Sequence, residues 1–474
     1  MQIVVAPGAT TGSVTVTAVD DTEDESDETV VVDIAAVTGG NEAGEQQQTT
    51  VITDDDDPPK LTVTSLTPTA SGFSAEFSTD LNTSVLNLYD TQTAGLGTAD
   101  VVLQGNTTGP VAGSLVIDPA LRKVTFIKSG DPLAPDTYTV TLRSAVDGFV
   151  DVGDQLLDGN DDGTEGDDHI STFEVAAPPA GAVTIGLPDF IRGPGQDVNL
   201  PANETNGIPV TISEGTNVRA VDLRIGYDPA LRNITGATVG ADAPAGASVV
   251  ANTVTPGLAI FVFFSTNPLP AGRGTFINVQ ASVPADDASG IYGTQQVLDV
   301  HEVTVSDGND NESTVVVDDA FQLTSFYADV SGNGRINAAD ASQVARFAAL
   351  IDAGFVGALN ADPVVVGDIS GNGRLNAADA SLLAQFAALI DVPQIPAIPG
   401  GIVITGTLWL PDPEDRTANP QDDLISDART PVTFELEPTD ARYTDIDRSF
   451  ADYDPADAEP VLTDLEEALD ELSE

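Results

Sequence analysis

The sequence predicts a mostly β protein, built from tandem β-sandwich modules with one small α-helical domain toward the C-terminus. Two observations lead to this prediction. Over most of the 474 residues, short segments with apolar residues at every second position recur between turns rich in Gly and Pro. Between residues 326 and 396 the pattern changes to two polar loops, each followed by apolar residues at helical spacing. The length suits roughly three to five domains.

The composition narrows the range of functions. The chain has 75 acidic and 17 basic residues, which gives a formal net charge of −58, and it has no cysteine. This charge disfavours nucleic acid and anionic membrane surfaces, and it favours calcium and other cations as partners. A marine or salty habitat is a second explanation of the acidity. The two histidines, His169 and His301, are far apart in the sequence, so histidine-based catalysis and zinc sites are disfavoured. No apolar run is long enough for membrane insertion.

Strand periodicity divides the first 325 residues into three modules, 1–57, 60–177 and 181–325. The proline pairs Pro58–Pro59 and Pro178–Pro179 mark the boundaries between them. Strand-like segments occur at residues 14–18, 30–34, 60–64, 73–77, 114–117, 123–127, 137–142, 182–185, 217–227, 259–264 and 274–281. Short strands at such spacing predict β-sandwiches.

The first module, residues 1–57, resembles the second half of a Calx-β domain in its segments 6–17, 19–29 and 50–57. That family is a β-sandwich whose acidic ends bind calcium. The resemblance implies calcium ligands at Asp20, Asp21, Glu25, Asp54, Asp55 and Asp56. An ordinary solvated acidic loop is the alternative interpretation for each of these residues.

The first strands of such a domain are missing from this module, and no signal peptide follows Met1. Two interpretations are open. Either Met1 lies inside a domain and the chain is a piece of a longer protein, or the missing strands come from another chain. Donated strands would be a mechanism of polymerisation.

The second module, residues 60–177, resembles the bacterial Ig-like domains of surface proteins in its segment 133–142. A later loop, Asp158-Gly-Asn160-Asp-Asp162-Gly163, places oxygen-bearing side chains at alternate positions before a Gly, as calcium loops do. The twelfth position of this loop is His169, so no carboxylate stands at that position. A calcium site at Asp158, Asn160 and Asp162 and a solvated turn are therefore both open.

The third module, residues 181–325, contains the segment Val-x-Leu-x-Ile-x-Tyr-Asp-Pro-x-Leu at 221–231, preceded by a Pro-Gly turn at 194–195. Both features resemble a cohesin-type domain, which implies a nine-stranded jelly roll. In that family the residue at Tyr227 belongs to the core and Asp228 to a turn, so neither is expected to have a chemical role.

Residues 329–340 and 368–379 repeat one loop, Asp-x-Ser-Gly-Asn-Gly-Arg-x-Asn-Ala-Ala-Asp, 39 residues apart. An EF-hand-type calcium loop supplies oxygens from positions 1, 3, 5, 7, 9 and 12, with Gly at position 6 and a backbone carbonyl at position 7. By position, the ligands are Asp329, Ser331, Asn333, Arg335, Asn337 and Asp340, then Asp368, Ser370, Asn372, Arg374, Asn376 and Asp379. A loop that turns on Asx hydrogen bonds without metal is the alternative.

The whole region 326–396, with its EF-hand-like loops and the helices after them, resembles a type I dockerin, the calcium-binding module that docks onto cohesin domains. Each loop has only two carboxylates, fewer than is usual in the family, so we expect an affinity suited to millimolar extracellular calcium. The linker between the repeats is also longer than usual. The resemblance places partner recognition at Ala338–Ala339 and Ala377–Ala378, and the identical pairs imply a two-fold symmetric face that can bind in either orientation.

Residues 402–474 form an acidic C-terminal region after a linker rich in Pro and Gly. Segments 402–410 and 431–436 are possible strands. Residues 460–472 have the periodicity of an amphipathic helix, which is either a docking helix or a capping helix with a frayed acidic end.

Together, these features predict a non-catalytic, extracellular or cell-surface protein that binds Ca²⁺ and acts in adhesion, scaffolding or filament assembly. Its expected partner is a cohesin-like domain, of its own chain or of a neighbouring copy, which implies a homo-oligomer or polymer. The alternative is an accessory, anchoring portion of an extracellular polysaccharide-degrading enzyme, because paired carboxylates can hydrolyse glycosides. A single Trp and 5% aromatic residues disfavour a sugar-stacking platform.

Overall fold

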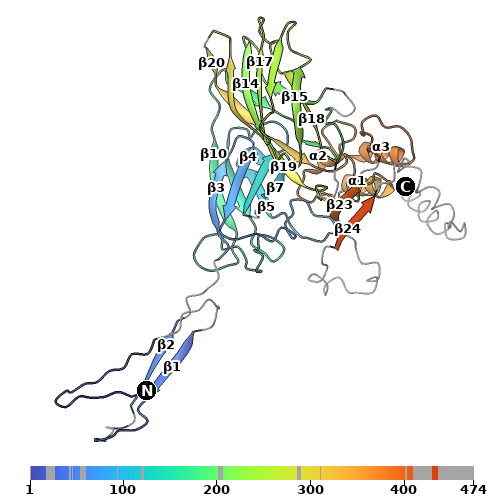
Figure 1. The fold of residues 1–474 in the computed structure, drawn as a ribbon. Coiled ribbons are helices and arrows are strands. Elements are labelled where there is room, and N and C mark those ends of the chain that lie inside the picture. Colours follow the sequence, from blue (N-terminus) through green and yellow to red (C-terminus); the bar gives the residue numbers. More distant parts are fainter. Residues whose placement is uncertain are drawn as a thin grey trace, which may run out of the picture. The chain divides into compact units, whose positions relative to one another are not determined.

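The computed structural model divides the chain into two compact units, Met1–Lys60 and Leu61–Glu474 (Figure 1). The residues that it describes are 2–17, 27–41, 44, 46–53, 60–92, 94–118, 122–200, 206–285, 290–309, 311–400, 403–408 and 430–435. For the last two segments it describes the backbone alone.

The first unit contains one antiparallel ribbon in which β1 (Glu28–Asp33) pairs with β2 (Gln47–Ile52). The strand predicted near residues 30–34 is present, whereas residues 14–17, also predicted to be a strand, lie outside regular structure. Nearly all residues of both strands are exposed. A two-stranded ribbon without a packed face is marginal in water, so the described part of this unit is a fragment of a sandwich at most.

The second unit begins with a sandwich of two four-stranded sheets, ordered β3-β4-β8-β7 and β10-β9-β5-β6. Its strands are β3 (Val63–Pro68), β4 (Gly72–Phe77), β5 (Val101–Gly105), β6 (Gly109–Pro110), β7 (Gly113–Ile117), β8 (Lys123–Lys128), β9 (Asp136–Leu142) and β10 (His169–Val175). The core between the sheets includes the stacked rings of Phe73 and Phe126, with 5.7 Å between ring centroids, and buried Leu115 and Val140. The predicted strands of this module are all present, and β5, β6 and β10 are additional.

A larger sandwich follows, with sheets ordered β15-β18-β13-β11-β21 and β12-β22-β19-β14-β17-β16, and with β20 paired to β19. Its strands are β11 (Val183–Gly186), β12 (Phe190–Ile191), β13 (Ile208–Ile212), β14 (Ala220–Gly226), β15 (Asn233–Val239), β16 (Ser248–Asn252), β17 (Leu258–Phe264), β18 (Gly274–Ser282), β19 (Gln295–Ser306), β20 (Glu312–Ser313), β21 (Val315–Asp318) and β22 (Ala320–Leu323). β11–β12 and β21–β22 each cross from one sheet to the other. If β11–β12 and β21–β22 are each counted as one interrupted strand, and the short β20 is left out, the sandwich has the nine strands that the resemblance implied.

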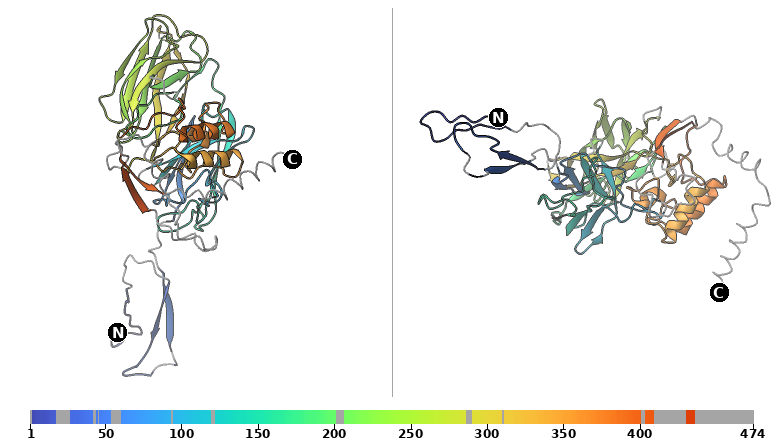
Figure 2. Two further views of the ribbon diagram at one scale, coloured as in Figure 1. Left: turned by 90° about the vertical axis from the view of Figure 1, so that its right-hand side faces the viewer. Right: turned by 90° about the horizontal axis from the view of Figure 1, so that it is seen from below.

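The helical domain contains α1 (Ala338–Ala348), α2 (Pro363–Gly367) and α3 (Ala377–Ala387). Figure 2 shows α1 and α3 side by side, and the buried side chains of Val344, Leu383 and Phe355 form part of their shared core. Among the described residues, no helix combines the length and apolar character needed to cross a membrane.

In the C-terminal region, β23 (Val403–Leu408) pairs antiparallel with β24 (Thr430–Glu435), as the two possible strands suggested. The helix predicted at 460–472 lies outside the described residues.

Candidate metal centre

The two repeated loops fold in the same way, around the carboxylate of their first residue. In the first loop, Asp329 Oδ1 accepts hydrogen bonds from the Ser331 hydroxyl at 3.1 Å and the Asn333 backbone N–H at 3.1 Å. Asp329 Oδ2 accepts from the Gly334 N–H at 2.6 Å. Gly334 has a φ of 77°, a backbone conformation that Gly adopts without strain. The sixth position therefore makes the sharp turn that the spacing predicts.

The last residue of the first loop, Asp340, closes the loop and lies in the first turn of α1. Its Oδ1 accepts from the Ser331 N–H at 2.9 Å, and its Oδ2 accepts from the Asn337 N–H at 2.8 Å. Asn337 in turn caps α1, because its side-chain oxygen accepts from the Ala339 N–H at 2.8 Å. This capping box fixes the helix start relative to the loop. It also commits the Asn337 oxygen, a predicted ligand, to the helix.

The second loop repeats these bonds almost atom for atom. Asp368 Oδ1 accepts from the Ser370 hydroxyl at 3.2 Å, and its Oδ2 accepts from the Gly373 N–H at 2.6 Å. Asp379 accepts from the N–H groups of Ser370 and Asn376, both at 2.8 Å. Asn376 caps α3, as Asn337 caps α1. At the fifth position, the side-chain oxygen of Asn333 accepts from the backbone N–H of Arg335 at 2.9 Å. In the second loop, that of Asn372 accepts from the N–H of Arg374 at the same distance.

The surroundings of the first loop raise the pKa of its carboxylates. Burial and, to a smaller extent, the nearby carboxylate of Asp340 raise the pKa of Asp329 to about 7. Burial also raises the pKa of Asp340. Two buried carboxylates with no cation beside them repel one another. The donor set of carboxylate, hydroxyl, amide and backbone oxygens suits a hard cation such as calcium.

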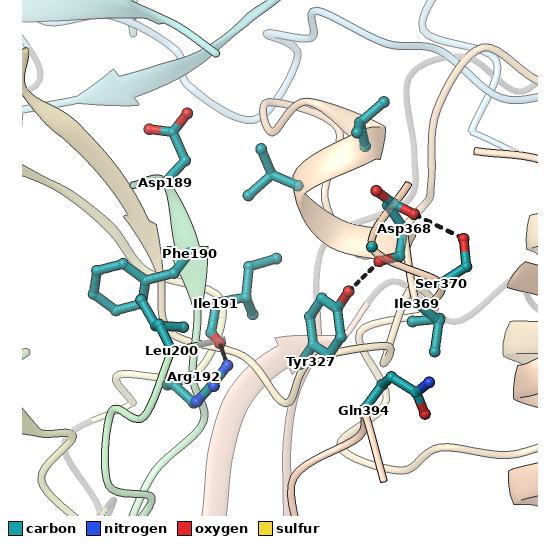
Figure 3. A pocket seen from close by; sticks show the side chains of 13 residues that line it. Asp189, Phe190, Ile191, Arg192, Leu200, Tyr327, Asp368, Ile369, Ser370 and Gln394 are labelled. Atoms are coloured by element: carbon teal, nitrogen blue, oxygen red, sulfur yellow. Dashed lines mark hydrogen bonds between the residues drawn. The ribbon is translucent and has the colours of Figure 1, made fainter. Parts of the chain in front are cut away.

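Figure 3 shows the second loop at the edge of a cavity of about 400 Å³. The hydroxyl of Tyr327 donates to the backbone carbonyl of Asp368 at 2.5 Å. On the other side of the cavity lie Phe190 and Ile191 of β12 and Arg192, so this loop faces the larger sandwich. Arg192 donates to the carbonyl oxygens of Ile191 and Asn199, which leaves its charge without a carboxylate partner among the described residues.

The third predicted loop, near residue 158, includes a carboxylate that the spacing did not predict, that of Asp167. Ligand oxygens of Asp158, Asp162 and Asp167 all lie within 4.8 Å of one another. Asp167 arrives because it forms a parallel bridge with Asp158, and its Oδ2 accepts from the Asn160 N–H at 3.1 Å. The twelfth position remains a histidine, and the third carboxylate of the cluster comes from the tenth position. His169 lies in β10, and its ring contacts the carbonyl of Gly159 at 2.9 Å.

The other predicted ligands cannot be placed. Asp20, Asp21, Glu25, Asp54, Asp55 and Asp56 lie outside the described residues.

The inter-repeat linker and the partner-recognition pairs differ in their contacts. The linker packs on the first sandwich: Leu88 and Tyr89 each donate a backbone hydrogen bond to the Leu359 carbonyl at 3.0 Å, and Leu115 donates to that of Asn360 at 2.8 Å. All four recognition residues, Ala338, Ala339, Ala377 and Ala378, are exposed. Contacts with the chain's own sandwiches therefore leave the predicted recognition face open.

Comparisons with known proteins agree with these domains. Residues 196–322 match the family model of the cohesin domain, and residues 327–387 match that of the type I dockerin domain. A search of curated proteins finds no match.

Solved structures similar to part of the chain are cohesins. A non-cellulosomal cohesin of the archaeon Archaeoglobus fulgidus is 16% identical, covers 30% of this chain and 89% of its own, and has a TM-score of 0.25. A cohesin of Clostridium acetobutylicum, solved in solution, is 20% identical over 30% of this chain and 90% of its own, with a TM-score of 0.25. A type I cohesin–dockerin complex of Clostridium thermocellum is 14% identical over 31% of this chain and 97% of that one, with a TM-score of 0.26.

Proposed function

Because the chain carries a cohesin domain and a type I dockerin domain, both non-catalytic modules of assembly, we propose that it is a self-assembling structural subunit. The dockerin of one copy binds the cohesin domain of the next, and calcium holds the dockerin in its binding conformation. The observation that carries this proposal is that both surfaces are left open by the chain's own fold.

On the cohesin domain, the open surface is the outer face of β16 and β17. Val250 on β16 lies directly opposite Val262 on β17, and these side chains are 57% and 37% exposed. Phe264, at the end of β17, is 49% exposed. Exposed apolar residues that share one sheet face are typical of interaction sites. In the described part of the chain, the dockerin makes no hydrogen bond to this face.

On the dockerin, the open surface is formed by both repeats. Beside the exposed Ala pairs, each helix ends in the same apolar pair, Leu350–Ile351 after α1 and Leu389–Ile390 after α3. All four of these side chains are exposed, and Leu350 is 90% exposed. Both leucines have a positive φ, 58° and 64°, which branched residues rarely adopt. Two small-residue pairs and two apolar pairs together suit an apolar sheet face such as that around Val262.

Calcium is the proposed cofactor of the two repeated loops, with Asp329, Asp340, Asp368 and Asp379 as the charged ligands. We extend the proposal to the loop with Asp158, Asp162 and Asp167, where three carboxylates converge. With two or three carboxylates per site, affinities near the roughly 10⁻⁴–10⁻³ M of extracellular modules are expected. A cell-surface or extracellular location would supply that much calcium.

Sedimentation velocity of the full chain in calcium and then in chelator tests the proposal. We expect large assemblies in a few millimolar calcium and monomers after chelation. If the chain remained monomeric at calcium concentrations well above the dissociation constants of its loops for calcium, the proposal would be overturned. A double variant, Ala339→Asp with Ala378→Asp, should bind calcium as the wild type does and yet remain monomeric.

A further inference from the structure

The first calcium loop makes a contact that the second loop lacks, with a tyrosine of the cohesin domain. The hydroxyl of Tyr292, in the segment before β19, lies within hydrogen-bonding distance of Asp329 Oδ2, the first residue of the loop. Tyr292 belongs to the region that matches the cohesin model, and Asp329 to the region that matches the dockerin model. One hydrogen bond thus joins the two domains at a metal ligand.

The direction of this bond follows from the other partners of the hydroxyl. The Tyr292 oxygen accepts hydrogen bonds from the Ser325 hydroxyl at 3.0 Å and from the Phe326 backbone N–H at 3.2 Å. A phenol oxygen has one proton to donate and two lone pairs to accept with. Because both lone pairs are in use, the proton points to Asp329. The tyrosine therefore acts as a donor to the carboxylate, as the outer partners of metal ligands commonly do.

The surroundings hold this tyrosine in place. Its ring packs on that of Phe326, with 5.6 Å between ring centroids. The Phe326 ring fills the space beside Gly193, where an added Cβ would lie 2.1 Å from a ring carbon. Phe326 also accepts a backbone hydrogen bond from the Asp329 N–H at 2.9 Å. Tyrosine, phenylalanine and the start of the loop therefore form one packed unit across the boundary between the two domains.

The second loop serves as an internal control, because it has the same ligand residues and the same internal hydrogen bonds. In the described residues, the Asp368 carboxylate accepts hydrogen bonds only from Ser370, Asn372 and Gly373 of its own loop. Its neighbouring tyrosine, Tyr327, donates to the backbone carbonyl instead. Asp329 is 2% exposed, whereas Asp368 is only half-buried. The ligand residues themselves therefore do not distinguish the two loops, whereas the contact with Tyr292 does.

We propose that the first calcium loop is a site shared by two domains, in which Tyr292 of the cohesin domain positions the Asp329 carboxylate and gives this loop the higher calcium affinity. A ligand that is already oriented loses less freedom on binding. By linkage, calcium in this loop strengthens the contact between the cohesin domain and its own dockerin. The inference rests on calcium binding by the loops, which is part of the proposed function, and not on assembly.

Calcium titration of the full chain by isothermal calorimetry tests this inference, with each loop measured separately. Asp379→Asn disables the second loop and Asp340→Asn the first, and each substitution keeps the side-chain shape. In the Asp379→Asn background, Tyr292→Phe should weaken calcium binding roughly 10- to 100-fold, as the loss of an outer hydrogen bond to a metal ligand does. In the Asp340→Asn background, Tyr292→Phe should leave the affinity unchanged.

A second buried tyrosine provides the matched control. Tyr138 donates one hydrogen bond to the Ala134 carbonyl at 2.8 Å in the first sandwich, remote from both repeated loops. Tyr138→Phe removes the same group and should not change calcium affinity in either background. Equal affinities of the two loops, or equal effects of Tyr292→Phe on both, would overturn the inference while leaving the proposed assembly standing. An absence of calcium binding by either loop would overturn the proposed function as well.

Discussion

Asp318, at the end of β21, has a buried carboxylate at the junction of the two sandwiches. The side chain is 6% exposed, and its Oδ1 has no hydrogen-bond partner. It fits there because its partner in β11 is Gly186, where an added Cβ would lie 2.7 Å from Asp318 Cβ. Burial, together with the nearby carboxylates of Asp189, Asp131 and Asp319, raises the pKa of Asp318 to about 8, although Lys128 acts to lower it.

This raised pKa makes the stability of the chain depend on pH. An unfolded Asp releases its proton near pH 4, whereas the folded chain keeps the proton on Asp318 up to about pH 8. Between these values the folded state binds more protons than the unfolded state, so the free energy of unfolding falls as pH rises. Asp189 acts in the same direction, because burial raises its pKa to about 7.

Replacing Asp318 with Asn should therefore stabilise the chain at alkaline pH. The gain in the free energy of unfolding should be small near pH 4 and should grow by about 1.4 kcal/mol for each pH unit between there and about pH 8, so that it is several kcal/mol larger at about pH 8.5 than at about pH 5. Urea unfolding at both pH values measures the difference. Asp154→Asn is the control, since Asp154 is exposed and has a φ of 64° that Asn also tolerates. If the two variants had the same pH dependence, Asp318 would not be the source.

At the scale of elements, the segment between the two repeated loops holds the dockerin on the first sandwich. Its backbone hydrogen bonds reach the loop between β4 and β5 and the strand β7 of that sandwich, and Ala353 adds another to the Asp90 carbonyl of the same loop at 3.1 Å. At its start, Asp352 accepts from Arg346 of α1 at 2.6 Å and from the backbone N–H of Gln92 at 2.9 Å. The longer linker is thus an ordered docking segment, which agrees with its unusual length.

Gly354 tests how tightly this segment is packed. An added Cβ there would lie 2.4 Å from Tyr89 Cβ and 2.7 Å from the Tyr89 carbonyl oxygen. Gly354→Ala should therefore force the segment away from the sandwich and cost about 1–3 kcal/mol, the usual range for overpacking. Thermal unfolding and limited proteolysis of the linker measure the loss. Gly236→Ala is the matched control, because an added Cβ there meets nothing within 4 Å. Equal stability of the two variants would mean that the linker yields without cost.

What the sequence could predict depended on how local the signal was. The fold of the two repeated loops was predictable, because most of their hydrogen bonds lie within twelve residues. Asp167 was missed, because it reaches Asp158 through a bridge rather than through loop spacing. Tyr292 was missed because it precedes Asp329 by 37 residues and belongs to another domain. The docking of the linker was not predictable either, since backbone groups such as Leu115 N–H and Asn360 C=O carry no residue-type signal.

At the scale of the whole molecule, the two proposed binding surfaces differ, so the contact between copies is not self-complementary. The β16–β17 face of one copy meets the two repeats of another, and such a heterologous contact closes into a ring or continues as a filament. Copies with net charges of −58 repel one another. Calcium ions bound to the loops reduce that charge and added salt screens it, so assembly should strengthen with both.

A complementation experiment distinguishes this geometry from a symmetric dimer. Val262→Asp places a charge on the apolar sheet face and blocks only the cohesin surface, whereas Ala339→Asp with Ala378→Asp blocks only the dockerin surface. Each variant alone should be monomeric in calcium, because each lacks one half of the contact. Mixed in equal amounts, they should form a dimer that stops at two copies, since one open cohesin face meets one open dockerin. Light scattering coupled to size exclusion measures these masses. Long assemblies of either variant alone would show that copies meet through another surface, and a mixture that stays monomeric would exclude pairing of the two surfaces.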